Sequence, residues 1–120
     1  MRLTEIDFGS AQPIEGYGPD FFRIGGAAHT APLLIVPGQV VGWGGYDDAE
    51  ALLPLAGQVD VLFIGTGRDI AHIPAALRQV LEEAGIGVEV MASPAACRTY
   101  NVLLSEGRRI AVALLPTGPA

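Results

Sequence analysis

The chain has 120 residues, half of them hydrophobic, and its 7 basic against 13 acidic side chains give a net charge of −6. All of the basic residues are arginines, which excludes enzymes that form a Schiff base through lysine and P-loops that need a lysine for phosphate. One cysteine and two histidines exclude a structural zinc site of four Cys or His ligands and a disulfide within the chain. A lone cysteine fits a reducing compartment.

The negative charge lies in the first half of the chain. Residues 1–60 hold two arginines and eight acidic residues, whereas residues 61–120 hold five of each. Nucleic acids and anionic lipid surfaces need a basic surface, so we expect neither as a partner. No apolar run approaches the roughly 20 residues of a membrane helix, and residues 1–7 lack the apolar core of a signal peptide. These features predict a cytoplasmic protein that is not embedded in a membrane.

The first third of the chain reads as short strands separated by glycine and proline. We expect strands at residues 6–8, 21–24, 33–36 and 39–41. The last two flank Pro37-Gly38 and predict a hairpin. His29 lies in an Ala- and Thr-rich stretch that we interpret as a turn. The region as a whole predicts an antiparallel β layer.

The remainder alternates helix and strand. Asp47 or Asp48 is expected to cap a short helix that carries Leu52 and Leu55, with Pro54 near its end. The elements expected after it are a strand at 59–64, a helix from Pro74 to Gly85, a strand at 87–91, a helix at 93–105 and a strand at 109–115. In the helix from Pro74, residues Ile73, Leu77, Val80, Leu81 and Ala84 are expected on one apolar face. In the next, the Ser93 hydroxyl is expected to accept from a first-turn N–H.

This order predicts the fold class. Strand–helix–strand–helix–strand within about sixty residues is typical of α/β domains with a partly parallel sheet. We therefore expect residues 1–120 to form one three-layer α/β domain, with a central mixed sheet and an additional β layer from the N-terminal third.

The carboxyl ends of the central strands are the expected place for a ligand. Glycines after a strand expose backbone N–H groups, and arginines with hydroxyls beside them would complement an anion. The candidate ligand-binding residues are Gly65, Thr66, Gly67, Arg68, Arg98, Thr99, Tyr100 and Asn101. The dinucleotide-binding fingerprint is not met, because Ile70 stands where Gly or Ala is required, so a tight strand exit is the simpler interpretation of Gly65-Thr66-Gly67.

Other chemistry-bearing residues form no complete constellation. Cys97 lies near the start of a predicted helix beside Arg98, a setting that lowers a thiol pKa, but a free cysteine more often packs as a small apolar group. Asp69 and His72 supply too few ligands for a metal site. We therefore expect no catalytic residue, metal or cofactor.

Several short motifs follow one another along the second half of the chain. They are Ile64-Gly65-Thr66-Gly67, Gly85-Ile86, Glu89-Val90-Met91, Ala96, Thr99-Tyr100-Asn101, Glu106-Gly107-Arg108 and residues 111–114. In order and spacing they resemble the family of unknown function that contains mitochondrial respiratory complex I assembly factor 3 and its bacterial and archaeal relatives. Leu34-Ile35 and Trp43 extend the resemblance loosely into the first half, and it looks closest to the bacterial members.

The resemblance implies a three-layer α/β fold with an additional β layer and no established catalytic residues. It also implies protein partners, because the mitochondrial member is a non-enzymatic factor that works with other assembly factors on early complex I intermediates at the inner membrane. Membrane-complex subunits or assembly factors are therefore the expected partners.

Two hypotheses of different class stay open. The first is a protein-binding assembly domain without catalysis. The second is a site for a small anionic ligand, or an enzymatic site, at the strand ends around Arg68 and Arg98. Beneath both lies the interpretation that Thr99, Tyr100 and Asn101 only satisfy buried groups and pack the sheet. A homodimer through an exposed edge of the β layer is a further possibility.

Overall fold

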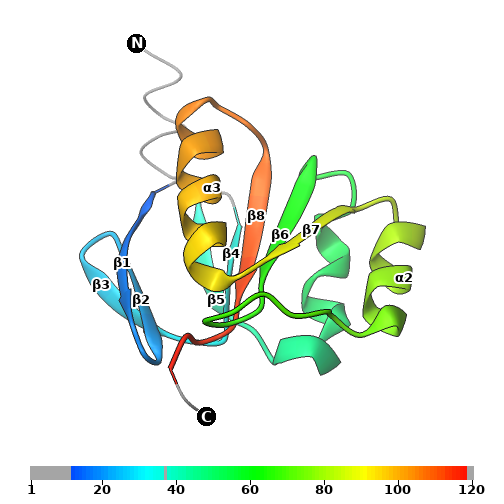
Figure 1. The fold of residues 1–120 in the computed structure, drawn as a ribbon. Coiled ribbons are helices and arrows are strands. Elements are labelled where there is room, and N and C mark those ends of the chain that lie inside the picture. Colours follow the sequence, from blue (N-terminus) through cyan, green and yellow to red (C-terminus); the bar gives the residue numbers. More distant parts are fainter. Residues whose placement is uncertain (1–11, 37, 119–120) are drawn as a thin grey trace.

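The computed structural model describes residues 12–36 and 38–118, and it contains two sheets with helices between and beside them (Figure 1). The strand expected at residues 6–8 lies outside the described residues. The small sheet has the order β1-β2-β3 and the central sheet β5-β4-β8-β6-β7. The strands are β1 (Ile14–Gly18), β2 (Phe21–Ile24), β3 (Ala27–Thr30), β4 (Leu33–Val36), β5 (Gln39–Gly42), β6 (Val61–Gly65), β7 (Gly87–Met91) and β8 (Ile110–Leu114).

The central sheet is mixed, as the sequence predicts. β6 pairs in parallel with β7 and β8, because helices α2 (Ala75–Glu83) and α3 (Ser93–Ser105) carry the chain back between successive strands. β4 pairs antiparallel with β8 and with β5. The predicted strands at 87–91 and helix at 93–105 agree with β7 and α3, and the remaining elements of this half differ by a few residues at their ends.

The small sheet is the additional β layer. Its β2–β3 hairpin turns through Gly25 and Gly26, whose φ angles of 61° and 81° suit a primed turn that other residues adopt at a cost. Sequence analysis missed β1 and β3, and it was wrong to place His29 in a turn, because His29 pairs with Phe22 within β3. The predicted β4–β5 hairpin is confirmed, but it extends the central sheet and does not join this layer.

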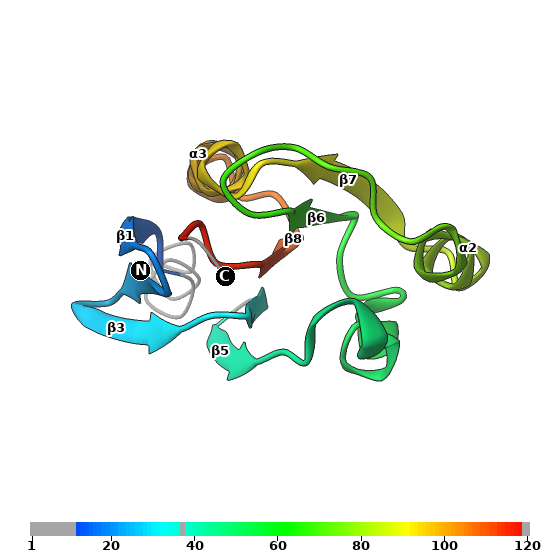
Figure 2. The same ribbon diagram turned by 60° about the horizontal axis from the view of Figure 1, so that its bottom comes forward.

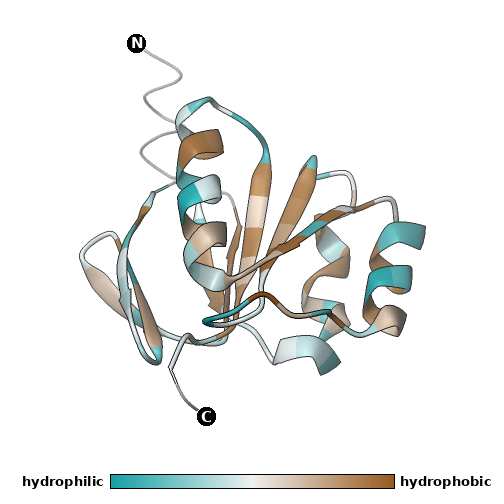
Figure 3. Cartoon of the chain, in the orientation of Figure 1, coloured by the Kyte–Doolittle hydropathy of each residue, from teal (hydrophilic) through white to brown (hydrophobic). Residues whose placement is uncertain are grey.

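Two apolar cores lie on opposite faces of the central sheet (Figure 2). Alternate residues of each strand enter each core: Leu62 and Ile64 of β6 face one, and Phe63 faces the other. One face is covered by α3 and the small sheet, the other by α2 and the segment between β5 and β6. The predicted three-layer α/β architecture is therefore confirmed. The central strands are accordingly apolar along most of their length (Figure 3).

The helix expected after Asp47 or Asp48 was wrong. That segment forms three short 3₁₀ turns at Gly45–Asp47, Ala49–Ala51 and Leu53–Leu55, and neither aspartate caps them through its side chain. Pro54 lies within the last turn, where it cannot donate the backbone hydrogen bond that a continuing α-helix needs. The apolar prediction still holds, because Leu52 and Leu55 are buried.

Helix α2 buries a narrower stripe than its sequence pattern indicates. Ile73, Leu77 and Leu81 are buried, whereas Val80 and Ala84 are exposed. The helix lies at the β7 end of the sheet, so only one row of side chains faces it. Within residues 12–36 and 38–118, no helix has the length and apolar character to cross a bilayer.

Candidate functional site

The carboxyl ends of β6 and β8 are joined to the start of α3 by one buried hydroxyl. Ser93 Oγ accepts from the Gly67 N–H at 2.9 Å and donates to the Leu115 carbonyl at 2.8 Å. Ser93 is fully buried, so the bond from Gly67 is made away from water, and the bond to Leu115 is partly buried. The expected helix cap was wrong: Ala92 occupies the N-cap position without a side-chain bond, and the Ser93 hydroxyl serves the sheet instead.

Gly65 is required by the same junction. A Cβ at this position would lie 2.7 Å from Ser93 Oγ and 2.8 Å from Leu114 Cδ2. Gly65 also accepts from the Leu115 N–H through its carbonyl at 3.0 Å. The close approach of three elements therefore explains this glycine without a ligand.

The loop after Gly65 is held by its own hydrogen bonds. The Thr66 N–H donates to the Met91 carbonyl at 2.9 Å, and the Thr66 hydroxyl donates to the Asp69 carbonyl at 2.8 Å. That hydroxyl also accepts from the Ala71 N–H at 3.1 Å. Since the Gly67 N–H is bound to Ser93, the backbone donors that were expected to face an anion are engaged within the protein.

Arg68 is the candidate that faces solvent at this edge. Its Nε lies 3.5 Å from Asp69 Oδ2, and both side chains are more than three-quarters exposed. The pair borders an open hollow of about 320 Å³ whose opposite wall is the segment after β8. The lining residues are Thr66, Gly67, Arg68, Asp69, Pro116, Thr117 and Gly118.

The four candidates on α3 do not line this hollow, and they differ in exposure. Arg98 is exposed, Thr99 is half-buried and Tyr100 is fully buried in the core beneath α3. None of the α3 candidates lines the hollow. The structure therefore brings together Thr66, Gly67 and Arg68, and it does not bring Arg98 or Tyr100 to them.

Asn101 fastens the small sheet to α3. Its Nδ2 donates to the Ile14 carbonyl and its Oδ1 accepts from the Ile14 N–H, each at 2.8 Å. The two residues are 87 positions apart in the chain. This paired bond continues the β1 backbone as another strand would, so Asn101 acts as a structural clamp between two layers.

Tyr100 and Cys97 are buried in the same core as Ile14. Burial raises the pKa of the Tyr100 hydroxyl to about 12, and among the described residues that hydroxyl has no hydrogen-bond partner. Burial also raises the pKa of the Cys97 thiol to about 12, against the opposing charge of Arg98. A thiol that stays protonated is a poor nucleophile, so the packed interpretation of Cys97 is the better one.

Across residues 12–36 and 38–118, no group of three or more His, Cys, Asp and Glu side chains is placed to hold an ion. Sequence reasoning missed the role of Ser93 and the wall at 116–118. The parallel pairing of β6 and β8 places their carboxyl ends at the same edge of the sheet. The rule that ligands bind at the carboxyl ends of strands, applied to β8, would have predicted that residues 116–118 line the hollow.

Comparison with known proteins identifies the family. Residues 14–115 match the family described as "Protein of unknown function (DUF498/DUF598)". The chain belongs to this family. An uncharacterised relative from Rhodobacter capsulatus is 54% identical over 97% of this chain and 94% of its own.

Two of the relatives compared carry the name of an assembly factor. NADH dehydrogenase (ubiquinone) 1 alpha subcomplex assembly factor 3 of Danio rerio is 36% identical over 97% of this chain and 71% of its own. The Homo sapiens protein of that name is 30% identical over 97% of this chain and 67% of its own. The resemblance read from the sequence is thereby confirmed.

Solved structures of related chains share the fold. A Bartonella henselae structure, described as an outer membrane protein, superposes with a TM-score of 0.81 at 33% identity and covers 90% of this chain and 97% of its own. A Mth938-like domain from Bordetella pertussis superposes with a TM-score of 0.76 at 28% identity over 100% of this chain and 95% of its own. The family fold is therefore the three-layer arrangement described above.

The Ser93 junction predicts a large effect of a small change. Ser93→Ala leaves the buried Gly67 N–H and the partly buried Leu115 carbonyl without this partner, and we expect it to lower the free energy of unfolding by about 1–3 kcal/mol. Denaturant titration measures this loss. Ser105→Ala is the matched control, because the exposed Ser105 hydroxyl bonds only to the Val102 carbonyl of its own helix. Equal stabilities of the two variants would contradict the role given to Ser93.

Removing the Tyr100 hydroxyl is expected to stabilise the protein, in contrast to removing the Ser93 hydroxyl. Tyr100→Phe removes an unpartnered buried hydroxyl, so we expect it to raise the free energy of unfolding at neutral pH by about 1 kcal/mol. The unfolded tyrosine ionises near pH 10.0 and the folded one near 12, so the native protein loses stability as pH rises through that window. Between pH 10 and 12, the Tyr100→Phe variant should lose less free energy of unfolding than the Tyr17→Phe variant, the exposed control. Destabilisation by Tyr100→Phe at pH 7 would show that the hydroxyl has a partner.

Proposed function

We propose that this chain is a non-enzymatic protein-binding domain that assists assembly of a membrane respiratory complex of the NADH dehydrogenase type. The observation that carries the proposal is the match to assembly factors over 97% of the chain, at 36% identity in Danio rerio and 30% in Homo sapiens. Its partners would be subunits of that complex or other assembly factors, and a cytoplasmic location and a homodimer stay predictions.

The use made of the motif residues supports a role without catalysis. Ser93, Gly65 and Asn101 join layers of the fold. Tyr100 and Cys97 lie in a core where burial raises the pKa of each side chain. A catalytic acid, base or nucleophile must reach its substrate with a pKa suited to the working pH. None of these five residues meets that requirement.

The alternative is a small anion in the hollow beside Arg68. Arg68 is the cation among the residues that line it, but it is paired with Asp69, and the N–H groups of Thr66 and Gly67 are already bonded. Thermal-shift titration with inorganic phosphate tests this alternative. A phosphate-dependent shift that Arg68→Ala abolishes would favour it over the assembly role.

The assembly proposal is tested in a bacterium that encodes both this chain and NADH dehydrogenase. Deleting the gene should lower the amount of mature complex and accumulate partial assemblies, as seen on native gels, and the intact gene should restore it. Tagged full-length protein crosslinked in growing cells should carry subunits of those partial assemblies. Normal accumulation of mature complex in the deletion strain would contradict the proposal.

A further inference from the structure

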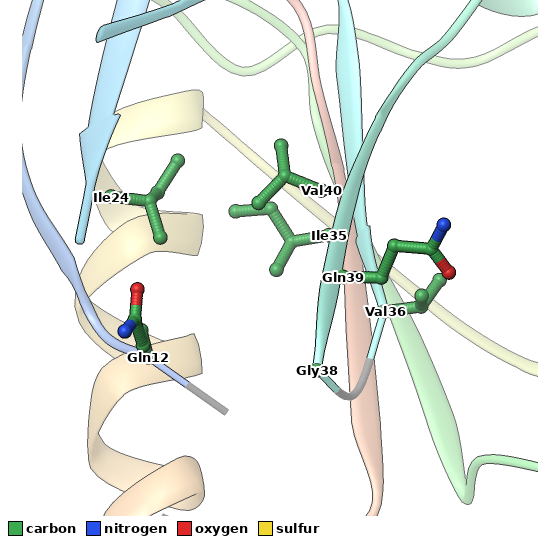
Figure 4. A pocket seen from close by; sticks show the side chains of 7 residues that line it. All are labelled: Gln12, Ile24, Ile35, Val36, Gly38, Gln39 and Val40. Atoms are coloured by element: carbon green, nitrogen blue, oxygen red, sulfur yellow. The ribbon is translucent and has the colours of Figure 1, made fainter. Parts of the chain in front are cut away.

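A groove runs between β3, at the edge of the small sheet, and β5, at the edge of the central sheet. It is an open hollow of about 320 Å³ lined by Ala28, His29, Thr30, Leu33, Val40, Val41 and Gly42. A smaller cavity of about 70 Å³ lies between the two sheets at the other end of the hairpin, where Ile24 faces Ile35 and Val40 (Figure 4). The gap between the sheets is therefore apolar on its inner side and open along two strand edges.

The hairpin register fixes which backbone groups of β5 face this groove. The Trp43 N–H donates to the Pro32 carbonyl, so these two opposite residues form a hydrogen-bonded pair. Every second pair along the hairpin is of the same kind, namely Leu34 with Val41 and Val36 with Gln39. In an antiparallel pair, residues that exchange hydrogen bonds alternate with residues whose groups point the other way. The N–H and C=O groups of Val40 and Gly42 therefore point away from β4, along the free edge.

The same rule applies to β3. The Ala31 N–H donates to the Asp20 carbonyl, so Asp20 and Ala31 form a hydrogen-bonded pair. Phe22 and His29, two positions along, form the next pair of this kind. The backbone groups of Ala28 and Thr30 therefore point away from β2. Both residues line the groove, so its two sides each offer a short row of backbone donors and acceptors.

Apart from their short length of four residues, the two edge strands lack the usual protection against pairing. Exposed strand edges are normally blunted by lysine, proline, inward charges or bulges. β3 reads Ala-Ala-His-Thr and β5 reads Gln-Val-Val-Gly, with no fully charged side chain and no proline in either. An edge of this kind is suited to accept another strand.

Charge indicates which strand would fit. Where β3 and β5 end, Asp20 bonds through its carbonyl to Ala31, and Asp48 accepts from the Gly44 N–H two residues beyond Gly42. Asp47 beside it is exposed. A second copy of this chain carries the same net charge of −6 and would be repelled, whereas a basic segment would meet opposite charge.

We propose that this groove binds an extended, basic segment of a partner protein as an added strand on β5. The proposal rests on the proposed function, since it names the chemistry of the partner that an assembly factor would hold. The segment would exchange main-chain hydrogen bonds with Val40 and Gly42, place apolar side chains against Leu33 and Val40, and present lysine or arginine toward Asp20 and Asp47.

Gly42 allows a sharp test of the main-chain bonds. Gly42→Pro removes the edge-facing N–H without removing a bond to β4, and a Cβ there meets no atom within 4 Å. Gly42→Ala is the matched control, since it keeps the N–H. The probe is a ten-residue synthetic peptide in which valine and threonine alternate with lysine and arginine, and its partner control carries glutamate at the basic positions.

We expect the basic peptide to bind the full chain in calorimetry and to slow amide exchange of Val40 and Gly42 in NMR. Gly42→Pro should weaken binding about tenfold or more, Gly42→Ala should leave it unchanged, and Asp20→Asn should weaken it and flatten its salt dependence. No binding, equal binding of the acidic peptide, or full binding by Gly42→Pro would overturn the proposal. So would a dimer in sedimentation that Gly42→Pro dissolves, because the occupant would then be a second copy.

The two proposals fail separately. If peptide binding is lost with Gly42→Pro but the deletion strain assembles NADH dehydrogenase normally, the groove stands and the assembly role falls. Suppose instead that the deletion strain is defective in assembly, and that the Gly42→Pro variant restores assembly fully and binds as much peptide as the native protein. The assembly role then stands and the groove proposal falls.

Discussion

The fold depends on one buried hydroxyl. Ser93 Oγ joins the loop after β6 to the chain after β8 at the point where α3 begins, through one buried and one partly buried hydrogen bond. The approach is so close that Gly65 has no room for a side chain. Because β8 is the middle strand of the central sheet, β6 lies beside it and α3 covers both, this junction sets how closely the helix packs on the sheet. Asn101 then fastens the small sheet to the same helix through both backbone groups of Ile14.

These roles change how the most distinctive segments of the chain are interpreted. Glycine, threonine, tyrosine and asparagine at strand and helix ends are the residue types expected in a ligand site, yet most of their polar groups here bond to backbone within the protein. Among the surfaces open to a partner are the hollow beside Arg68 and the edges of β3 and β5. These exposed backbone edges suit the protein-binding role proposed above.

Periodicity and turn residues predicted most of the fold, because the central strands are continuously apolar and the helices between them begin and end at proline, serine and glycine. The β1 and β3 strands escaped prediction because Ile-Glu-Gly-Tyr-Gly and Ala-Ala-His-Thr have little β-propensity, and their pairing with β2 stabilises them. The candidate site residues all lie at or soon after strand ends in the sequence, which does not establish that their side chains meet in space. Helix α3 turns Arg98 outward and Tyr100 inward, and only tertiary packing decides which face of a helix is buried.

Tyr100 and its neighbours act in folding, and we expect partner binding at the surface. The most direct measurement is the amount of assembled NADH dehydrogenase in a strain whose copy of this chain carries Tyr100→Phe, normalised to the amount of folded variant in the same cells. The account predicts full assembly, since the substitution leaves every surface unchanged. A variant that is folded and abundant but fails to support assembly would show that the Tyr100 hydroxyl has a functional role and would contradict the account.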